Sequence, residues 1–166
     1  VNIPSVCRFL DVGGGKGTFV SELKKIYPKV DAAVFDLPGS HSENSGHRCI
    51  IGSFKEDELP AGYDIISLVR ILYDHRDETI RDLLGKAYSA LDKGGRLIVS
   101  EPMLGADRPT LWGDVYFAMY TLAMSTGKTR SPDQVSGFIK DAGFSNVTIH
   151  KSARPFITTV IEAQKT

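Results

Sequence analysis

The apolar residues of the chain fall into two kinds of segment, short continuous runs and stretches with helical spacing. Continuous runs predict buried strands at residues 8–12, 31–35, 48–51, 63–69 and 96–100. Apolar residues at the helical period predict helices at residues 19–26, 77–91, 110–124 and 131–143. Asp77 is expected to cap the second of these helices. Two closing runs, 147–150 and 156–161, are separated by only a few residues, which suits an antiparallel hairpin.

This succession of elements predicts one α/β domain. The run 63–69 is of the kind covered on both faces, which is typical of a strand in a parallel sheet. Five strand–helix units followed by a hairpin predict an open, mostly parallel, seven-stranded sheet with helices on both faces. Residues 40–47 are polar and turn-rich, so we expect a loop there. The sequence contains no internal repeat and no low-complexity segment.

Composition and charge narrow the function classes. The 166 residues, 42% apolar and 24% charged, suit one globular domain. Twenty Lys and Arg balance twenty Asp and Glu, so the formal net charge of zero argues against a general nucleic-acid binder. The longest apolar stretch, 115–124, is too short to span a membrane, and the first residues do not resemble a signal peptide. Cys7 and Cys49 have neither zinc-ligand nor disulfide spacing, so no metal is expected and a reducing, cytoplasmic compartment is the default.

A glycine-rich loop follows the first predicted strand. Its sequence is Asp11-Val12-Gly13-Gly14-Gly15-Lys16-Gly17, and the missing side chains let the backbone approach a nucleotide-like ligand closely. The dinucleotide fingerprint fails in both glycine registers, and the phosphate-loop motif fails because Lys16 is followed by glycine rather than Ser or Thr. The remaining D-x-G-x-G-x-G pattern resembles the first motif of the S-adenosylmethionine-dependent methyltransferases.

An acidic residue at the end of the second predicted strand supports this interpretation. The Asp36 carboxylate can accept both hydroxyl groups of a ribose, and open α/β sheets bind ligands at the carboxyl ends of their strands. The alternative is that the glycines only make a tight turn and that Asp36 is an ordinary acid at a strand end. An NAD-dependent oxidoreductase is a further alternative, although it would need the missing third glycine of its fingerprint.

Later segments resemble a narrower family. The stretches 35–38 and 52–54, and the Gly94-Gly95 turn before a strand ending in an acid, are similar to small-molecule O-methyltransferases related to caffeate and acetylserotonin methyltransferases. Within this family, the bacterial hydroxyneurosporene (1-hydroxycarotenoid) O-methyltransferases are the branch that the chain resembles over nearly its whole length. The strings that carry this likeness are IISLVRILYDH at 65–75, VSEPM at 99–103, YTLAM at 120–124 and GKTRS at 127–131. This branch methylates the tertiary hydroxyl at a carotenoid end.

The resemblance implies a Rossmann-like class I methyltransferase fold with S-adenosylmethionine as cofactor. The cofactor-binding residues that it implies are Asp11, Gly13, Gly15, Gly17, Asp36, Gly52, Ser53, Phe54 and Arg70. The loop would meet the methionine part, Asp36 the ribose, and Ser53 and Phe54 the adenine side. The family often has Asp where Ser53 stands, and Phe54 can instead be a core aromatic residue. Arg70 is expected to be functional, because a buried, unpaired guanidinium would be costly.

Methyl transfer to a hydroxyl needs alignment of the reacting atoms and a group that takes the proton. The resemblance places a catalytic His at the position of Tyr73, so that role does not carry over. The candidate catalytic residues are therefore His75, Tyr73, Glu101 and Asp74. His75 is the expected base because its unperturbed pKa lies near neutrality, with packing or capping of the turn as the alternative. Glu101 matches an acid that holds the catalytic His in relatives, and Tyr73 can orient the hydroxyl.

Partners follow from the same resemblance. The family normally carries an N-terminal helical dimerisation domain, so residues 1–166 look like the catalytic domain of a longer homodimeric protein. The helix at 110–124 is either core or one wall of an apolar tunnel for a polyene. The expected acceptor is a hydroxycarotenoid, with another phenolic or polyketide-like metabolite, or a non-catalytic binding domain, as alternatives. A cytoplasmic protein could also lie peripherally on the membrane that holds an apolar substrate.

Overall fold

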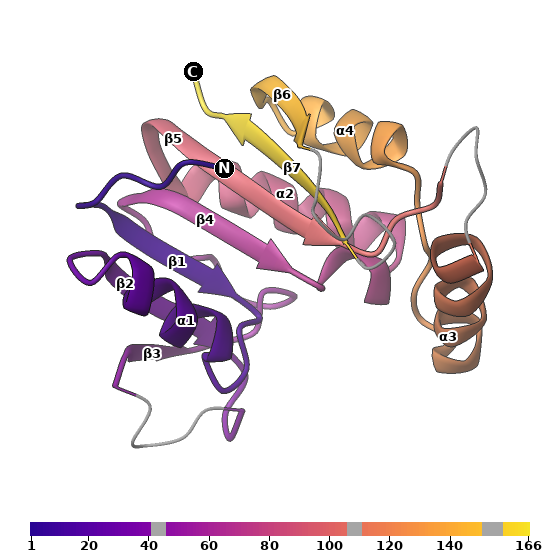
Figure 1. Cartoon of the computed structure of the whole chain (residues 1–166), viewed down its shortest axis with the longest axis horizontal. Coiled ribbons are helices and arrows are strands. Elements are labelled where there is room, and N and C mark those ends of the chain that lie inside the picture. The colour runs from indigo at the N-terminus through magenta and orange to yellow at the C-terminus, as the bar shows by residue number, and fades with distance from the viewer. Residues whose placement is uncertain (41–45, 106–110, 151–157) are drawn as a thin grey trace.

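One mixed sheet organises the part of the chain that the structure describes, residues 1–40, 46–105, 111–150 and 158–166 of a computed structural model. Its seven strands have the order β3-β2-β1-β4-β5-β7-β6 (Figure 1). The strands are β1 Arg8–Val12, β2 Asp31–Asp36, β3 Arg48–Ile51, β4 Tyr63–Val69, β5 Leu91–Glu101, β6 Ser145–His150 and β7 Thr159–Gln164. The α-helices are α1 Thr18–Ile26, α2 Asp77–Ala90, α3 Phe117–Met124 and α4 Pro132–Asp141. A 3-10 turn, Leu72–Asp74, and a π-helical segment, Leu111–Tyr116, complete the described elements.

The direction of the strands confirms the predicted fold class. Strands β3, β2, β1, β4 and β5 pair in parallel, whereas β7 is antiparallel to both β5 and β6. The chain reverses its strand order on leaving β3 for β4, which lies on the other side of β1. In an open α/β sheet, this reversal places a ligand crevice at the carboxyl ends of the strands.

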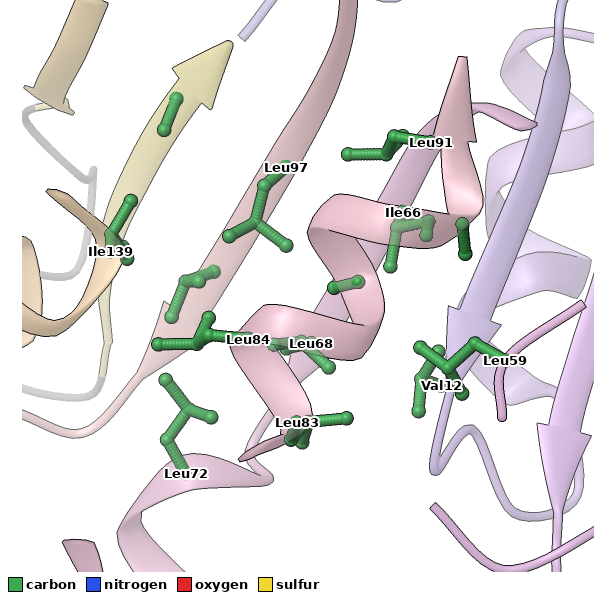
Figure 2. Close-up of a cluster of buried hydrophobic side chains, with 14 of the residues drawn as sticks. Val12, Leu59, Ile66, Leu68, Leu72, Leu83, Leu84, Leu91, Leu97 and Ile139 are labelled. Carbon is green, nitrogen blue, oxygen red and sulfur yellow. The ribbon is translucent and has the colours of Figure 1, made fainter. Parts of the chain in front are cut away.

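Alternate residues of the strands build two separate cores, one on each face of the sheet. On one face, Phe9 packs with Val20 and Leu23 of α1. On the other face, the side chains of α2 and α4 meet the central strands, as Figure 2 shows for Leu84, Leu68 and other labelled residues. Helices therefore cover both faces, as predicted. Within the described residues, no helix is both long and apolar enough to cross a lipid bilayer.

Several predicted boundaries were wrong for identifiable reasons. Helix α2 ends at Ala90, and β5 begins at Leu91, well before the predicted start at 96, because Leu91 pairs with Tyr63 of β4 and is buried. The residue before α2 is Arg76, and Asp77 makes no capping bond. Strand β6 begins earlier than predicted, and β7 extends to Gln164; residues 156 and 157 of the predicted strand lie outside the described residues.

The count of five strand–helix units was also wrong. Residues 52–62, which join β3 to β4, are all described and contain turns but no helix. The predicted helix at 110–124 is divided between the π-helical segment and α3, and Thr110 lies outside the described residues. The segment that includes α3 extends beyond the ends of β4 and β5, away from the sheet (Figure 1).

Candidate active site

The glycine-rich loop lies at the carboxyl end of β1. Gly13, Gly15 and Gly17 have φ angles of 72°, 55° and 74°, in the left-handed region that favours glycine. At Gly13 an added Cβ would also overlap the side chain of Ile71, which follows β4. The loop therefore needs glycine both for its backbone conformation and for its close approach to the neighbouring strand end.

Asp36, at the end of β2, is hydrogen-bonded directly to this loop. Its Oδ2 accepts a hydrogen bond from the backbone N–H of Gly15 at 2.7 Å, and its Oδ1 accepts one from the N–H of Leu37 at 2.6 Å. An ionised carboxylate has about four lone-pair sites, so two remain for a ligand. The structure thus brings the loop and the acid, each expected to bind the cofactor, into direct contact.

A cavity of about 250 Å³ opens between these elements. Its lining comes from Gly13, from Asp36 and Leu37, from residues 52–55 after β3, and from Ile71 and His75 after β4. The structure thus brings Gly13, Asp36, Gly52, Ser53 and Phe54 together as predicted. Of the other predicted cofactor residues, Asp11, Gly15, Gly17 and Arg70 do not line this cavity.

The segment after β3 is held in place by two residues that the sequence patterns did not indicate. Asp57 Oδ2 accepts a hydrogen bond from the Ser53 N–H at 2.8 Å. Lys86 of α2 donates to the Phe54 carbonyl oxygen at 2.9 Å and also pairs with Asp82. Phe54 packs partly against the core and also lines the cavity, so its position is compatible with either interpretation of this residue.

Asp11 lies beneath the glycine loop rather than on the cavity wall. Its side chain is buried, and Oδ1 accepts a hydrogen bond from the Ser67 hydroxyl at 2.6 Å. An added Cβ at Gly14 would overlap the other carboxyl oxygen, so the loop rests directly on Asp11. Burial raises the pKa of Asp11 to about 7, against the lowering effect of the Ser67 hydrogen bond. The buried carboxyl of Asp11 therefore supports the loop by direct packing.

The turn after β4 carries the candidate catalytic residues and is fixed by Glu101. The Glu101 carboxylate accepts hydrogen bonds from the N–H groups of Ile71 and Leu72 at 2.7 and 2.8 Å, with a longer contact to the N–H of Tyr73 at 3.5 Å. Burial raises the pKa of Glu101 to about 8, although these backbone hydrogen bonds lower it. Glu101 therefore holds the backbone of the turn. Among the described residues, no hydrogen bond joins the Glu101 carboxyl to the imidazole of His75.

Tyr73 and Arg70 form a second group beside this turn. The Arg70 guanidinium donates to the Tyr73 hydroxyl at 3.3 Å and lies over the ring of Phe117. The Tyr73 ring also packs with Phe117 and Tyr120, with ring centroids 6.0 Å apart in both pairs. Arg70 is exposed, which corrects the expectation of a buried guanidinium; its φ angle of 60° is unusual for a residue with a side chain.

Asp74 and His75, although adjacent in sequence, have different surroundings. Burial raises the pKa of Asp74, and the nearby Tyr73 hydroxyl and Arg70 lower it, so its carboxyl belongs to the Tyr73 group. The His75 ring instead packs edge-to-face against Phe54 at 5.2 Å and lines the cavity. Burial and the positive charges of Lys55 and Arg130 lower the pKa of His75, which favours a neutral imidazole.

Comparison with known proteins identifies the family. Residues 1–145 match the family model described as an O-methyltransferase domain. The chain belongs to this family. It is 45% identical, over 99% of its length, to demethylspheroidene O-methyltransferase of Rhodobacter capsulatus, and 39% identical, over 98%, to the enzyme of that name in Cereibacter sphaeroides. These alignments cover 43% and 46% of the two relatives, so the chain spans less than half of their length.

Solved structures agree with this assignment. Human N-acetylserotonin methyltransferase in complex with SAM has a TM-score of 0.85 and 29% identity, and the match covers 97% of this chain and 48% of that one. PigF with SAH has a TM-score of 0.82 and 30% identity, covering 95% and 50% of the two chains. The family and fold inferred from the sequence motifs are confirmed.

Proposed function

We propose that this chain is the S-adenosylmethionine-binding domain of an O-methyltransferase that methylates a hydroxyl group of an apolar small molecule. The observation that carries the proposal is a single crevice in which Gly13, Asp36 and Phe54 line a cavity next to the Tyr73 turn. Relatives with solved SAM and SAH complexes share this fold over nearly the whole chain. Because the chain spans less than half of the length of its curated relatives, the activity of a whole protein is part of this proposal.

The residues that line the cavity fit the proposed cofactor. Two lone-pair sites of Asp36 are available for the hydroxyl groups of a ribose. Phe54, Ile71 and Leu37 offer apolar surface for a flat base. The absence of a side chain at Gly13 leaves room for close approach of the rest of the ligand. When bound, S-adenosylmethionine supplies an electrophilic methyl group on a positively charged sulfur.

The turn after β4 is proposed to hold the acceptor. The Tyr73 hydroxyl, oriented by Arg70, would hydrogen-bond the acceptor hydroxyl and align its oxygen. Glu101 keeps this alignment by holding the N–H groups of Ile71 and Leu72. Phe117 and Tyr120 would exclude water on the same side.

Two residues, Asp74 and His75, are candidates to accept the proton of the acceptor hydroxyl. Asp74 Oδ1 is buried and has no hydrogen-bond partner among the described residues, and the carboxyl interacts with Tyr73, so we propose that Asp74 accepts the proton of a hydroxyl bound there. The neutral imidazole of His75, the base expected from the sequence, is chemically able to accept a proton, but its ring packs on Phe54 in the cavity. This geometry favours Asp74 as the base and gives His75 a place beside the cofactor.

The finer proposal concerns the acceptor, a hydroxycarotenoid. The two relatives named demethylspheroidene O-methyltransferase support it, as does the apolar surface next to Tyr73. Other relatives, such as acetylserotonin O-methyltransferase of Bos taurus at 30% identity, make a phenolic or indole acceptor the alternative. Assays with labelled S-adenosylmethionine and either 1-hydroxycarotenoids or catechols and indoles test this. Methylation confined to the catechols and indoles would contradict the carotenoid acceptor without contradicting methyl transfer.

A proposal about domain organisation follows from the same comparisons. Residues 1–166 would form one catalytic domain, and a helical domain elsewhere in a longer protein would make it a homodimer. Exposed apolar side chains around α3, among them Leu111, Met119 and Leu122, support the need for a covering partner.

A further inference from the structure

Arg130 is buried and bonded to several groups at once, although the sequence indicated no role for it beyond its place in the GKTRS string. Only 3% of the residue is exposed. Its Nε and Nη2 donate to Asp77 Oδ1 at 2.9 and 2.5 Å. Its Nη1 donates to the carbonyl oxygens of Leu72 and Lys128 at 3.2 and 2.7 Å, and Nη2 also donates to the carbonyl of His75 at 2.9 Å.

These contacts surround the turn that carries the candidate catalytic residues. The carbonyls of Leu72 and His75 flank Tyr73 and Asp74 in the chain, and Arg130 holds both. Of the two carbonyls between them, that of Tyr73 accepts a hydrogen bond from the Lys128 N–H at 2.9 Å. Arg130 and Lys128 thus hold three carbonyl groups of the turn.

The N–H groups of the same turn are held from another direction by Glu101. Two separate segments therefore fix the turn. Glu101, at the end of β5, binds N–H groups of the turn, and residues 128–130 bind its carbonyl groups. The second segment can approach this closely only because residue 127 is glycine, since an added Cβ there would overlap the Tyr73 carbonyl oxygen.

The chemistry of these contacts requires arginine. A guanidinium offers five N–H donors in a rigid, planar fork, whereas a lysine ammonium is a compact charge with three donors. Lysine at this position could keep the ion pair with Asp77, but it could not also reach the carbonyls of Leu72, Lys128 and His75. The charge requirement and the geometric requirement can therefore be separated by substitution.

We propose that Arg130 is a positioning residue that sets the acceptor side of the turn, Tyr73 and Asp74, relative to His75 in the cofactor cavity. This inference rests on the proposed methyl transfer. Asp77 shares the role by orienting the guanidinium. Arg130 does not line the cofactor cavity, and its hydrogen bonds go to the backbone of the turn rather than to the proposed site of the acceptor. It therefore acts only through the backbone of residues 72–75.

The test compares Arg130→Lys with the wild-type chain. We expect backbone amide hydrogen exchange at residues 71–75 to rise at least tenfold while the rest of the fold keeps its protection. We expect kcat for methyl transfer to fall tenfold or more, and the affinity for S-adenosylhomocysteine, measured by calorimetry, to fall severalfold, at temperatures where the variant is folded. Arg96→Lys is the matched control, since Arg96 of β5 makes a half-buried ion pair with Glu162 of β7 and, among the described residues, no hydrogen bond to residues 71–75.

Two results would overturn the proposal. One is unchanged exchange at residues 71–75 in Arg130→Lys. The other is a lower melting temperature with unchanged kcat and unchanged affinity below it, which would make Arg130 purely structural. Failure of the wild-type chain to bind S-adenosylhomocysteine would instead contradict the proposed function, and the exchange measurement would still decide whether Arg130 fixes the turn.

Discussion

Asp36 Oδ2 accepts a hydrogen bond from the backbone N–H of Gly15 at 2.7 Å, so the acid that ends β2 is attached to the loop that leaves β1. The two strands are parallel neighbours, and their carboxyl ends meet at one edge of the sheet. The contact aligns a carboxylate with a backbone that has no side chains to block a ligand. The proposed cofactor site depends on this relationship.

Asp36→Ala is expected to weaken binding of S-adenosylhomocysteine tenfold or more. The loss corresponds to about 1.5–3 kcal/mol, the usual contribution of hydrogen bonds to a charged group. Calorimetry on the purified chain measures it. Asp31→Ala is the control, since Asp31 is an exposed acid at the opposite end of the same strand. Equal affinities for Asp36→Ala and wild type would remove Asp36 from the site.

Asp74 and His75 are separable by their kinetic effects. Asp74→Asn is expected to lower kcat by about 10²-fold with unchanged cofactor affinity, because it removes the proton acceptor beside Tyr73. His75→Gln is expected to weaken S-adenosylhomocysteine binding severalfold and to lower kcat less, because its ring lines the cavity. Turnover and calorimetry on both variants measure this. The reverse pattern would make His75 the base.

Glu101 is expected to make stability depend on pH. Its pKa is raised from 4.5 to about 8 in the folded chain, so the folded state binds more protons than the unfolded state between these values. The stabilisation is therefore complete below about pH 4.5 and is lost as the pH rises through 8. Urea unfolding from pH 5 to 9 should show a fall in the free energy of unfolding that is smaller in Glu101→Gln than in wild type.

The exposed acid Glu58 provides the control for this measurement. Glu58→Gln should leave the pH dependence as it is in wild type. Identical pH profiles for Glu101→Gln and wild type would show that Glu101 titrates near its ordinary pKa despite its burial.

Gly13→Ala and Gly85→Ala are expected to have opposite effects. At Gly13 the positive φ angle and the overlap with Ile71 oppose any side chain, so both stability and cofactor binding should fall. At Gly85, inside α2, an added Cβ meets nothing within 4 Å, so alanine should stabilise the chain by about 0.5–1 kcal/mol. Thermal unfolding and calorimetry measure both. A stabilised Gly13→Ala chain would contradict the account of the loop.

The exposed surface around α3 predicts self-association of the isolated chain. Met119 and Leu122 are 67% and 77% exposed. Sedimentation velocity should show oligomers at high concentration, and the double variant Met119→Ser, Leu122→Ser should shift them toward monomer. Ile26→Ser, which removes an exposed apolar residue at the end of α1, is the control. A wild-type chain that stays monomeric would contradict the proposed covering partner.

The sequence alone was sufficient for the features that local patterns encode. Glycines with positive φ angles, an acid at a strand end and apolar runs at periods of two or 3.6 residues are short-range signals, so Gly13, Asp36 and most strands were predicted. The start of β5 was missed because Leu91 joins the sheet through pairing with Tyr63, a contact distant in sequence.

The roles within the site depend on tertiary structure. The sequence by itself determined the family and the mostly parallel sheet, and it indicated Tyr73, Asp74, His75 and Glu101 as candidate catalytic residues. Only the folded chain decided that Glu101 bonds to backbone N–H groups and that His75 packs on Phe54. It also decided that Arg130, which is distant from the turn in sequence, binds the carbonyl groups of the turn. The physical reason is that a side chain's partner is set by where separate elements pack, and no local spacing records that.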